Sequence, residues 1–313
     1  MEAKKGNLFF LIILLSIIAA DIVLPFIFHF LKVPYYMSSF FLEIIALLIP
    51  ALIYLTIRKK PFKETLRLNP ISIQSLLLLV VVVILSEPIM SFLNIFSQAF
   101  FHNYVSDSLK MMEGVPYLVF VGVIAVTPAI CEEMVMRGIV LSNYKKVDIK
   151  IAAIMNGFLF GVFHLGPQQF FYAFALGVIF AYVVEITDSI FSSMFCHFLI
   201  NGFSATVAWI ASRVHITAAN SNIQFSSLPL GQKLGYLIFF FILVVIFTPL
   251  LILVLKELDR MNGYKLHKRE LAVKAYSDTA AVKEKVMTWH IYLVIFLYIA
   301  FLAVVTMLGG NRV

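Results

Sequence analysis

Charged residues are scarce in this chain of 313 residues: Asp, Glu, Lys and Arg together make up 13% of the sequence, whereas 62% of it is hydrophobic. The mean hydropathy is +0.98, and a soluble protein of this length carries far more charge. This composition excludes a soluble globular protein and predicts a polytopic membrane protein.

Cysteine is also scarce. The two cysteines, Cys131 and Cys196, both fall within long apolar runs. Buried in membrane spans, they cannot form an exterior disulfide framework, so the redox compartment cannot be inferred from them. Cysteine is a common small apolar filler, and a packing role is therefore favoured over a thiol nucleophile.

Nine apolar runs are long enough, or nearly so, to cross a hydrocarbon core of about 30 Å. Their approximate bounds are 8–31, 38–57, 74–100, 117–143, 151–165, 170–187, 189–212, 234–255 and 287–308. The fifth and sixth are short and are separated by five residues, so eight spans are the alternative count. The first run is too long for a signal-peptide core and is predicted to be a retained helix. The predicted fold is all-α, with about nine transmembrane helices.

The formal net charge of +7 reflects membrane topology rather than an affinity for nucleic acid. With nine spans and a cytoplasmic N-terminus, 18 of the 24 lysines and arginines fall in the inside segments 1–7, 58–73, 144–150 and 256–286. Five fall outside, and one lies within the fourth span. By the positive-inside rule this bias predicts a multi-pass protein of the cell membrane with its N-terminus in the cytoplasm and its C-terminus outside.

Three parts are expected along the chain. Residues 1–114 hold N-terminal membrane helices and a basic cytoplasmic loop, 115–212 hold the segment that carries candidate chemistry, and 213–313 hold C-terminal helices. The loop 256–286 in the last part is mixed in charge and is expected to be partly helical and to lie against anionic lipid. A solvated connector without a specific partner is its simpler interpretation.

The fourth run contains three charges, Glu132, Glu133 and Arg137, where an ionisable side chain costs roughly 2.5–3.5 kcal/mol or more. Glu133 and Arg137 are four residues apart, share a helix face and can pair, which lowers the cost of burying both. Glu132 is turned about 100° away and has no cation at that spacing, so its carboxylate is left to act as a base. A purely structural ion-paired cluster is the alternative.

Two histidines lie in equally apolar surroundings. His164 ends the fifth run, after Gly157 and Gly161, whose spacing lets a neighbouring helix approach closely. His197 and Asn201 are four residues apart in the seventh run, so a ring N–H and an amide group could point at one oxygen, as an oxyanion would require. A lone histidine in a membrane span is more often structural.

Depth supports a shared site. At 1.5 Å per residue, Glu132 lies about 18 Å from the inner end of its span and His164 about 21 Å from Lys150. On the same basis His197 and Asn201 lie roughly 13 and 19 Å from the inner end of theirs. All four therefore fall at similar depth in the membrane, which favours one functional centre over separate structural roles.

The ordered motifs Glu132-Glu133-x-x-x-Arg137, Phe160-x-x-x-His164 and His197-x-x-x-Asn201 resemble the signatures of the CAAX protease and bacteriocin-processing family (CPBP, or Abi). That family includes the Ras-converting CAAX endopeptidases. The resemblance covers about residues 115–207. It implies an intramembrane protease with a catalytic four-helix core, here spans four to seven, around a water-containing cavity open toward the cytoplasm.

The resemblance also implies roles. Glu132 with His164 would activate the attacking water, and His197 with Asn201 would stabilise the oxyanion. The remaining charged pair of the fourth span, Glu133 and Arg137, would hold the site in shape. The ninth span and the loop 256–286 have no counterpart in the resemblance, so substrate access and recognition are not predicted.

A zinc ion is possible in principle, held by Glu132, His164 and His197. The sequence lacks the helical HExxH arrangement, and using Glu132 as a ligand would remove the best general base. A glutamate-activated water with no obligatory cofactor is therefore favoured.

The expected partners are the lipid bilayer and a membrane-associated or lipidated peptide or protein substrate, and no nucleic acid. Two alternatives remain: a non-catalytic scaffold or bacteriocin-immunity protein of the same fold, and a proton-coupled transporter. The transporter is disfavoured because no matching broken helices occur in two halves of the chain. Oligomeric state cannot be inferred from the sequence.

Overall fold

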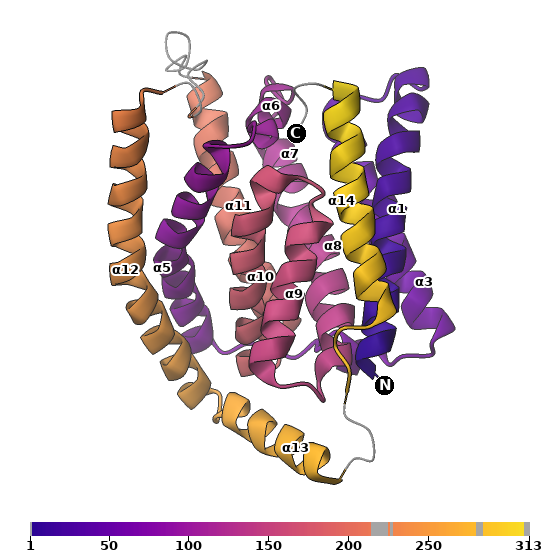
Figure 1. The fold of residues 1–313 in the computed structure, drawn as a ribbon, viewed down its shortest axis with the longest axis vertical. Helices are drawn as coiled ribbons and strands as arrows, with labels where there is room; N and C mark the ends of the chain where they lie inside the picture. Colours follow the sequence, from indigo (N-terminus) through magenta and orange to yellow (C-terminus); the bar gives the residue numbers. More distant parts are fainter. Residues whose placement is uncertain (1, 214–224, 226–227, 280–283, 310–313) are drawn as a thin grey trace.

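The helices of this protein stand side by side in an upright bundle, with one helix, α13, lying across an end (Figure 1). The computed structural model describes residues 2–213, 225, 228–279 and 284–309, and this part of the chain contains helices and turns but no strand. Within it, eight helices are long and apolar enough to cross a membrane. The predicted all-α polytopic fold is therefore confirmed. In this described part of the chain, the number of helices long enough to span a membrane is eight, which is the alternative to the predicted nine.

The N-terminal part supplies three of these candidates. Its elements are α1 (Glu2–Phe30), α2 (Tyr35–Glu43), the π-helical η1 (Ile44–Leu48), α3 (Ile49–Ile57), α4 (Phe62–Thr65), α5 (Ile73–Gln98) and α6 (Tyr104–Lys110). α2, η1 and α3 form one continuous span. The start of α5 is set by Ser72, whose hydroxyl accepts a hydrogen bond from the Ser75 N–H at 3.1 Å.

The fourth span changes its helical pitch along its length. It consists of α7 (Tyr117–Val121), the π-helix η2 (Gly122–Val126), α8 (Thr127–Glu133), the π-helix η3 (Met134–Val140) and the 3₁₀-helix η4 (Leu141–Tyr144).

Pro128 accounts for the first change of pitch, because it has no N–H to donate to the carbonyl four residues earlier. The N–H of Thr127 bonds instead to the carbonyl of Gly122, five residues back, and its hydroxyl donates to the same oxygen at 2.9 Å. Such π-helical turns often mark functional sites.

The next two helices form a short hairpin. α9 (Ile149–Phe163) starts at Asp148, whose Oδ1 accepts from the Lys150 N–H at 2.8 Å, and α10 (Pro167–Thr187) follows after a three-residue turn. With 15 residues α9 rises about 22 Å, less than the ~30 Å of a hydrocarbon core. The hairpin turn lies below the upper ends of α1 and α14 in Figure 1. The predicted span 151–165 is thus too short for a full crossing.

Glycines allow α9 and α10 to pack backbone to backbone. A Cβ added to Gly177 would lie 2.5 Å from the Cα of Gly157, and one added to Gly157 would lie 2.6 Å from the Phe174 carbonyl oxygen. A Cβ at Gly161 would meet the Phe170 carbonyl at 2.9 Å. Neighbouring lipid chains are as apolar as the helices, so close packing of this kind holds membrane helices together. The predicted small-residue face on the fifth run is confirmed.

The C-terminal part consists of α11 (Ile190–Arg213), α12 (Leu230–Met261), α13 (Lys265–Thr279) and α14 (Trp289–Gly309). α12 packs against α5, and α14 packs against α1. α1 begins and α14 ends at opposite ends of the bundle (Figure 1). The predicted loop 256–286 is largely helical, because it holds the end of α12 and all of α13.

The basic segments meet at one end of the molecule. Lys60 lies 3.9 Å from Glu2, and Arg67, Lys145 and Lys265 line one pocket there. The four segments that the charge bias assigns to the inside therefore share one face, as a common side of the membrane requires.

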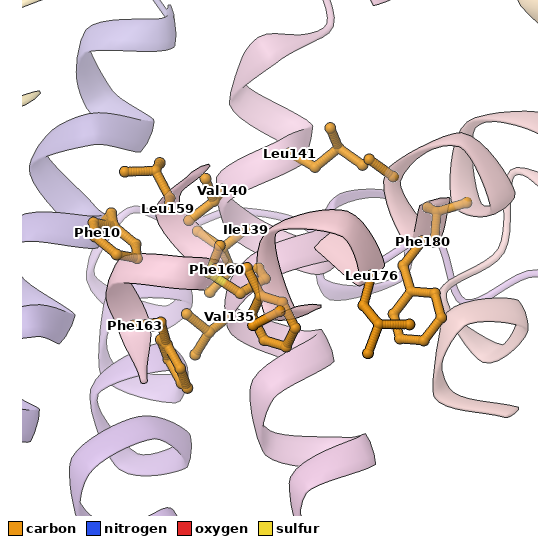
Figure 2. Packing of buried hydrophobic residues seen from close by; sticks show 14 of the residues in the cluster. Phe10, Val135, Ile139, Val140, Leu141, Leu159, Phe160, Phe163, Leu176 and Phe180 are labelled. Atoms are coloured by element: carbon orange, nitrogen blue, oxygen red, sulfur yellow. The ribbon is translucent and has the colours of Figure 1, made fainter. Parts of the chain in front are cut away.

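The hydrophobic core lies between the fourth span, the α9–α10 hairpin and α1. Val135 and Ile139 are fully buried, and Figure 2 shows them beside Phe160 and Phe163 of α9 and Phe10 of α1. This packing holds in place the part of the fourth span that directly follows Glu132 and Glu133 in the sequence.

Candidate active site

The three charges of the fourth span are buried in the bundle. Glu132 and Glu133 end α8 with exposed fractions of 5% and 0%, and Arg137 in η3 is also at 0%. Arg137 Nη1 donates to Glu133 Oε1 at 2.9 Å. The predicted same-helix pair is therefore present, and each partner offsets a charge that would be very costly alone.

Two aromatic rings pack against the Arg137 guanidinium, which is paired with Glu133 through Nη1. Its carbon lies 4.2 Å from the centroid of the Phe160 ring and 5.2 Å from that of Phe180. The Nε and Nη2 atoms of Arg137 make no hydrogen bond within the described residues. The faces of the two rings attract the guanidinium cation instead of hydrogen-bond acceptors. Phe160 belongs to a sequence motif, whereas Phe180 lies in the apolar middle of α10 and belongs to none of the motifs.

His197 of α11 connects both glutamates. Its Nδ1 lies 2.9 Å from Glu133 Oε1, and its Nε2 lies 3.9 Å from Glu132 Oε2. An ionised carboxylate only accepts hydrogen bonds, so Nδ1 carries a proton in this contact and Nε2 is directed to Glu132. Glu133 thus binds Arg137 and His197 with one oxygen.

Glu132 makes fewer polar contacts than Glu133. Its buried Oε2 makes no hydrogen bond in the described part of the chain. The 3.9 Å to His197 Nε2 exceeds hydrogen-bond distance, and a gap of this size between polar atoms is one that water commonly bridges. Glu132 thus has no hydrogen bond to His197, and its role as a base stays a prediction.

His164 caps α9 at the tip of the hairpin. Its ring centroid lies 5.0 Å from that of Phe160, and the His197 centroid lies 6.2 Å from the same Phe160 ring. One aromatic side chain thus touches both histidines. The structure brings His164 to the edge of the cluster, but within the described residues its ring makes no hydrogen bond to Glu132.

Asn201 lies one turn beyond His197 and is turned to the fourth span. Its Nδ2 donates to the carbonyl of Ile124 at 3.2 Å. The amide and the His197 ring are therefore not directed at one shared atom in this structure. The NH₂ group still has a second hydrogen to donate.

The possible zinc ligands Glu132, His164 and His197 do not fit a metal centre. Across residues 2–213 and the other described segments, no three His, Cys, Asp or Glu side chains are grouped so as to hold a metal ion.

Residues 114–203 match the family model of the type II CAAX prenyl endopeptidase Rce1-like proteins. This segment is Rce1-like. It runs from the residues before α7 to the middle of α11 and contains every predicted site residue. The family resemblance carried by the three motifs is confirmed, and the family implies CAAX endopeptidase activity. No curated protein and no solved structure matches the chain.

One further acid ends a helix that packs against the Rce1-like segment from outside it. Glu43 ends α2, which packs against α8. Its Oε2 is buried without a hydrogen bond among the described residues. From the sequence, an acid near the start of the second apolar run is expected to be an interfacial or bundle-facing residue rather than a catalytic one.

Proposed function

We propose that this protein is an intramembrane endopeptidase that hydrolyses a peptide bond of a membrane-associated or lipidated peptide or protein. One observation carries this function. A buried carboxylate with a free oxygen, Glu132, lies 3.9 Å from a histidine within an Rce1-like segment. A buried acid without a cation in its own helix is costly in a membrane, and catalysis gives a reason for it.

In the proposed reaction Glu132 accepts a proton from a water molecule. The resulting hydroxide oxygen bonds to the scissile carbonyl carbon, and the C–N bond breaks as the nitrogen takes up the proton that Glu132 held. General-base catalysis of this kind contributes about 10²–10⁴-fold in rate. We assign His164, at the hairpin tip beside Phe160, to the same water.

His197 and Asn201 are the proposed oxyanion donors. Glu133 accepts from His197 Nδ1 at 2.9 Å, and an imidazolium would in addition present an N–H at Nε2. Asn201 would add its second amide hydrogen, since the first is bonded to Ile124. Donors fixed in advance of the reaction stabilise charge as it develops.

We propose no metal for the reaction. Glu132 cannot be a ligand and the base at the same time, and the next acid, Glu133, already binds Arg137 and His197. The proposed location is the cell membrane, with the basic end of the bundle in the cytoplasm, as the distribution of lysine and arginine favours.

The test is cleavage by the full-length protein reconstituted in lipid vesicles. The substrates are a fluorescent peptide ending in a prenylated CAAX sequence, the same peptide without the lipid, and a labelled peptide library. Glu132→Gln keeps the shape of the side chain and removes the base, so we expect cleavage to fall at least about 10²-fold. Glu113→Gln is the matched control, because Glu113 is an exposed acid before the fourth span.

Thermal unfolding in detergent establishes that both variants are folded. Cleavage by Glu132→Gln at the wild-type rate would exclude the proposed base. Folded wild-type protein that cuts none of the peptides would exclude the protease and leave the scaffold or immunity protein. Ion flux into the vesicles without cleavage would identify a transporter.

A further inference from the structure

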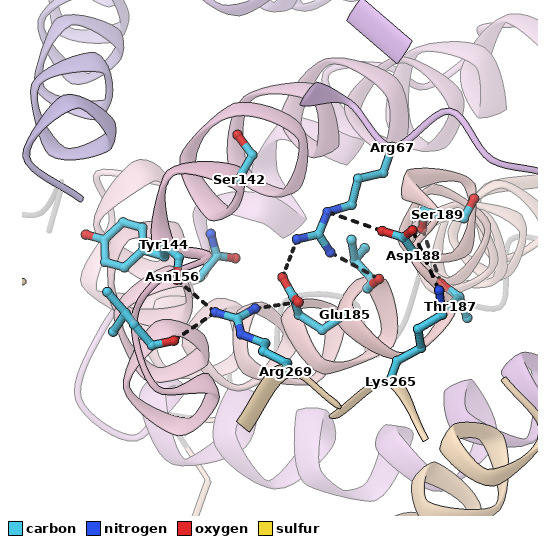
Figure 3. Close-up of polar contacts among 12 residues, drawn as sticks. Arg67, Ser142, Tyr144, Asn156, Glu185, Thr187, Asp188, Ser189, Lys265 and Arg269 are labelled. Atoms are coloured by element: carbon cyan, nitrogen blue, oxygen red, sulfur yellow. Dashed lines mark hydrogen bonds and ion pairs between the residues drawn. The ribbon is translucent and has the colours of Figure 1, made fainter. Parts of the chain in front are cut away.

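The pocket at the basic end of the bundle lies apart from the candidate active site. It has a volume of about 250 Å³, and every side chain that lines it is charged. The lining residues are Arg67, Lys145, Glu185, Asp188, Lys265 and Arg269, most of which Figure 3 shows. None of them belongs to the candidate active site. We call it the basic pocket.

The floor of the basic pocket is one carboxylate between two guanidiniums. Arg67 Nη2 donates to Glu185 Oε1 at 2.5 Å, and Arg269 pairs with Glu185 Oε2 from the other side (Figure 3). The three side chains are 4–9% exposed. A single carboxylate neutralises one of the two arginines, so the trio keeps one positive charge in a nearly buried setting.

The rim adds a further excess of positive charge. Asp188 lies 3.8 Å from Arg67 Nε and 3.9 Å from Lys265 Nζ, too far for a hydrogen bond in either case. Lys145 makes no ion pair within the described residues and supplies the fourth cation. Four cations face two anions, which leaves the pocket with a net charge of +2.

The two arginines of the pocket floor also have N–H donors without an acceptor. The Nε atoms of Arg67 and Arg269 are buried and make no hydrogen bond in the described part of the chain. A buried N–H without an acceptor is unfavourable, so an additional oxygen is expected there. Arginine forks suit the several oxygens of a phosphate group.

We propose that the basic pocket binds a phosphate group, either the terminal phosphate of an anionic lipid headgroup or free phosphate. A phosphate monoester carries close to two negative charges at neutral pH and three acceptor oxygens, which match the net charge and the spare donors. A divalent cation is excluded by the charge, and a single carboxylate would leave about one positive charge unmatched. The site is independent of the proposed protease, because the two share no residue.

The bound phosphate would join four parts of the chain. They are the segment after α4 with Arg67, the turn after η4 with Lys145, the end of α10 with Glu185 and Asp188, and α13 with Lys265 and Arg269. Arg269 already holds α13 to the core, because its Nη2 donates to the carbonyls of Tyr144 at 2.8 Å and Val147 at 3.0 Å. Phosphate is therefore expected to stabilise the docked position of α13.

Binding is tested on the full-length protein in two forms. Detergent-solubilised protein is titrated with inorganic phosphate at constant ionic strength, with chloride as the balancing salt. Protein in nanodiscs of phosphatidylcholine is compared with protein in nanodiscs that also contain phosphatidic acid. The readouts are the calorimetric Kd for phosphate and the Tm in each nanodisc.

The pocket variant is Lys145→Gln with Lys265→Gln, which removes two cations and leaves the buried arginine pairs intact. The control, Lys268→Gln with Lys274→Gln, removes two exposed lysines of α13 that lie outside the pocket. We expect the pocket variant to weaken phosphate binding by about tenfold or more, because each lost cation weakens a charge-assisted contact. The control variant and Glu132→Gln are expected to bind as the wild type does.

A response to phosphatidic acid without binding of inorganic phosphate assigns the pocket to a lipid headgroup, and binding of both assigns it to phosphate in general. Either result supports the proposal if the pocket variant loses the binding. Equal affinities in the wild type and the pocket variant for both sources would overturn it.

Discussion

The side-chain amide of Asn201 donates to the backbone carbonyl of Ile124 at 3.2 Å. In a regular α-helix this carbonyl would accept the N–H of the residue four positions later, which is Pro128, and proline has none. Asn201 therefore replaces a hydrogen bond that the fourth span cannot make for itself. The same contact ties the helix that carries His197 to the span that carries Glu132.

The first prediction concerns this replacement. Asn201→Leu leaves the Ile124 carbonyl without its partner and is expected to cost about 1–3 kcal/mol of unfolding free energy. Pro128→Ala supplies an N–H at the right position, so the double variant is expected to recover part of that loss. Unfolding of the single and double variants in detergent forms a double-mutant cycle.

Cleavage by the same variants separates the two roles of Asn201. If the amide also stabilises the oxyanion, Asn201→Leu loses activity and Pro128→Ala does not restore it. Recovery of full activity in the double variant would show that Asn201 acts through the fold alone.

The second prediction concerns the buried ion pair. Glu133→Gln leaves Arg137 without its carboxylate and gives His197 Nδ1 a neutral amide in place of a charged acceptor. Breaking one partner of a buried pair typically costs about 3–5 kcal/mol, and we expect a loss of that size in unfolding experiments. Glu257→Gln breaks an exposed pair with Arg260 and serves as the control, with no resolvable change expected. Equal stabilities for the two variants would contradict the structural role of Glu133.

The third prediction concerns the hairpin that carries His164. Gly177→Ala places a methyl group 2.5 Å from the Cα of Gly157, so α9 and α10 must separate. Overpacking of this kind costs about 1–3 kcal/mol or more, and a fall in Tm is expected. Gly235→Ala on α12 is the control, since no atom lies within 4 Å of its added Cβ, and it is expected to be neutral or slightly stabilising. A neutral Gly177→Ala would mean that the hairpin is not closely packed.

The sequence predicted local relationships well and contacts between helices poorly. The Glu133–Arg137 pair follows from a spacing of four residues, and the small-residue face of α9 follows from Gly157 and Gly161. Which nitrogen of His197 meets which glutamate depends on the rotation of α11 against α8. The residue pattern of one helix carries no information about how two helices are rotated against each other.

Two further features escaped prediction for physical reasons. The π-helical turns around α8 shift the register of the fourth span, so that Asn201 meets Ile124 rather than an atom shared with His197. The loop 256–286 is mixed in charge, so it is expected to be partly helical, and a solvated connector without a specific partner is favoured. Its order in the structure depends on Arg269, whose partners are Glu185 and two backbone carbonyls distant in the sequence.

The fourth prediction concerns metal. Glu132 acting as a base requires no zinc, so exhaustive chelation is expected to leave the rate of peptide cleavage unchanged. The measurement is the initial rate before and after dialysis against a chelator, with metal content checked by atomic spectroscopy. Loss of activity that zinc restores, and magnesium does not, would contradict this prediction.

The last prediction concerns α13. Arg269→Gln removes the donors to Tyr144 and Val147 and leaves Glu185 with Arg67 alone, so the helix loses its main attachment to the core. Hydrogen exchange of α13 amides is expected to accelerate by about tenfold or more, since hydrogen bonds to charged groups are worth roughly 1.5–3 kcal/mol. Lys268→Gln, one position earlier on the exposed side, is the control and should exchange as the wild type does. Unchanged protection of α13 in Arg269→Gln would mean that apolar contacts such as that of Leu266 hold the helix in place.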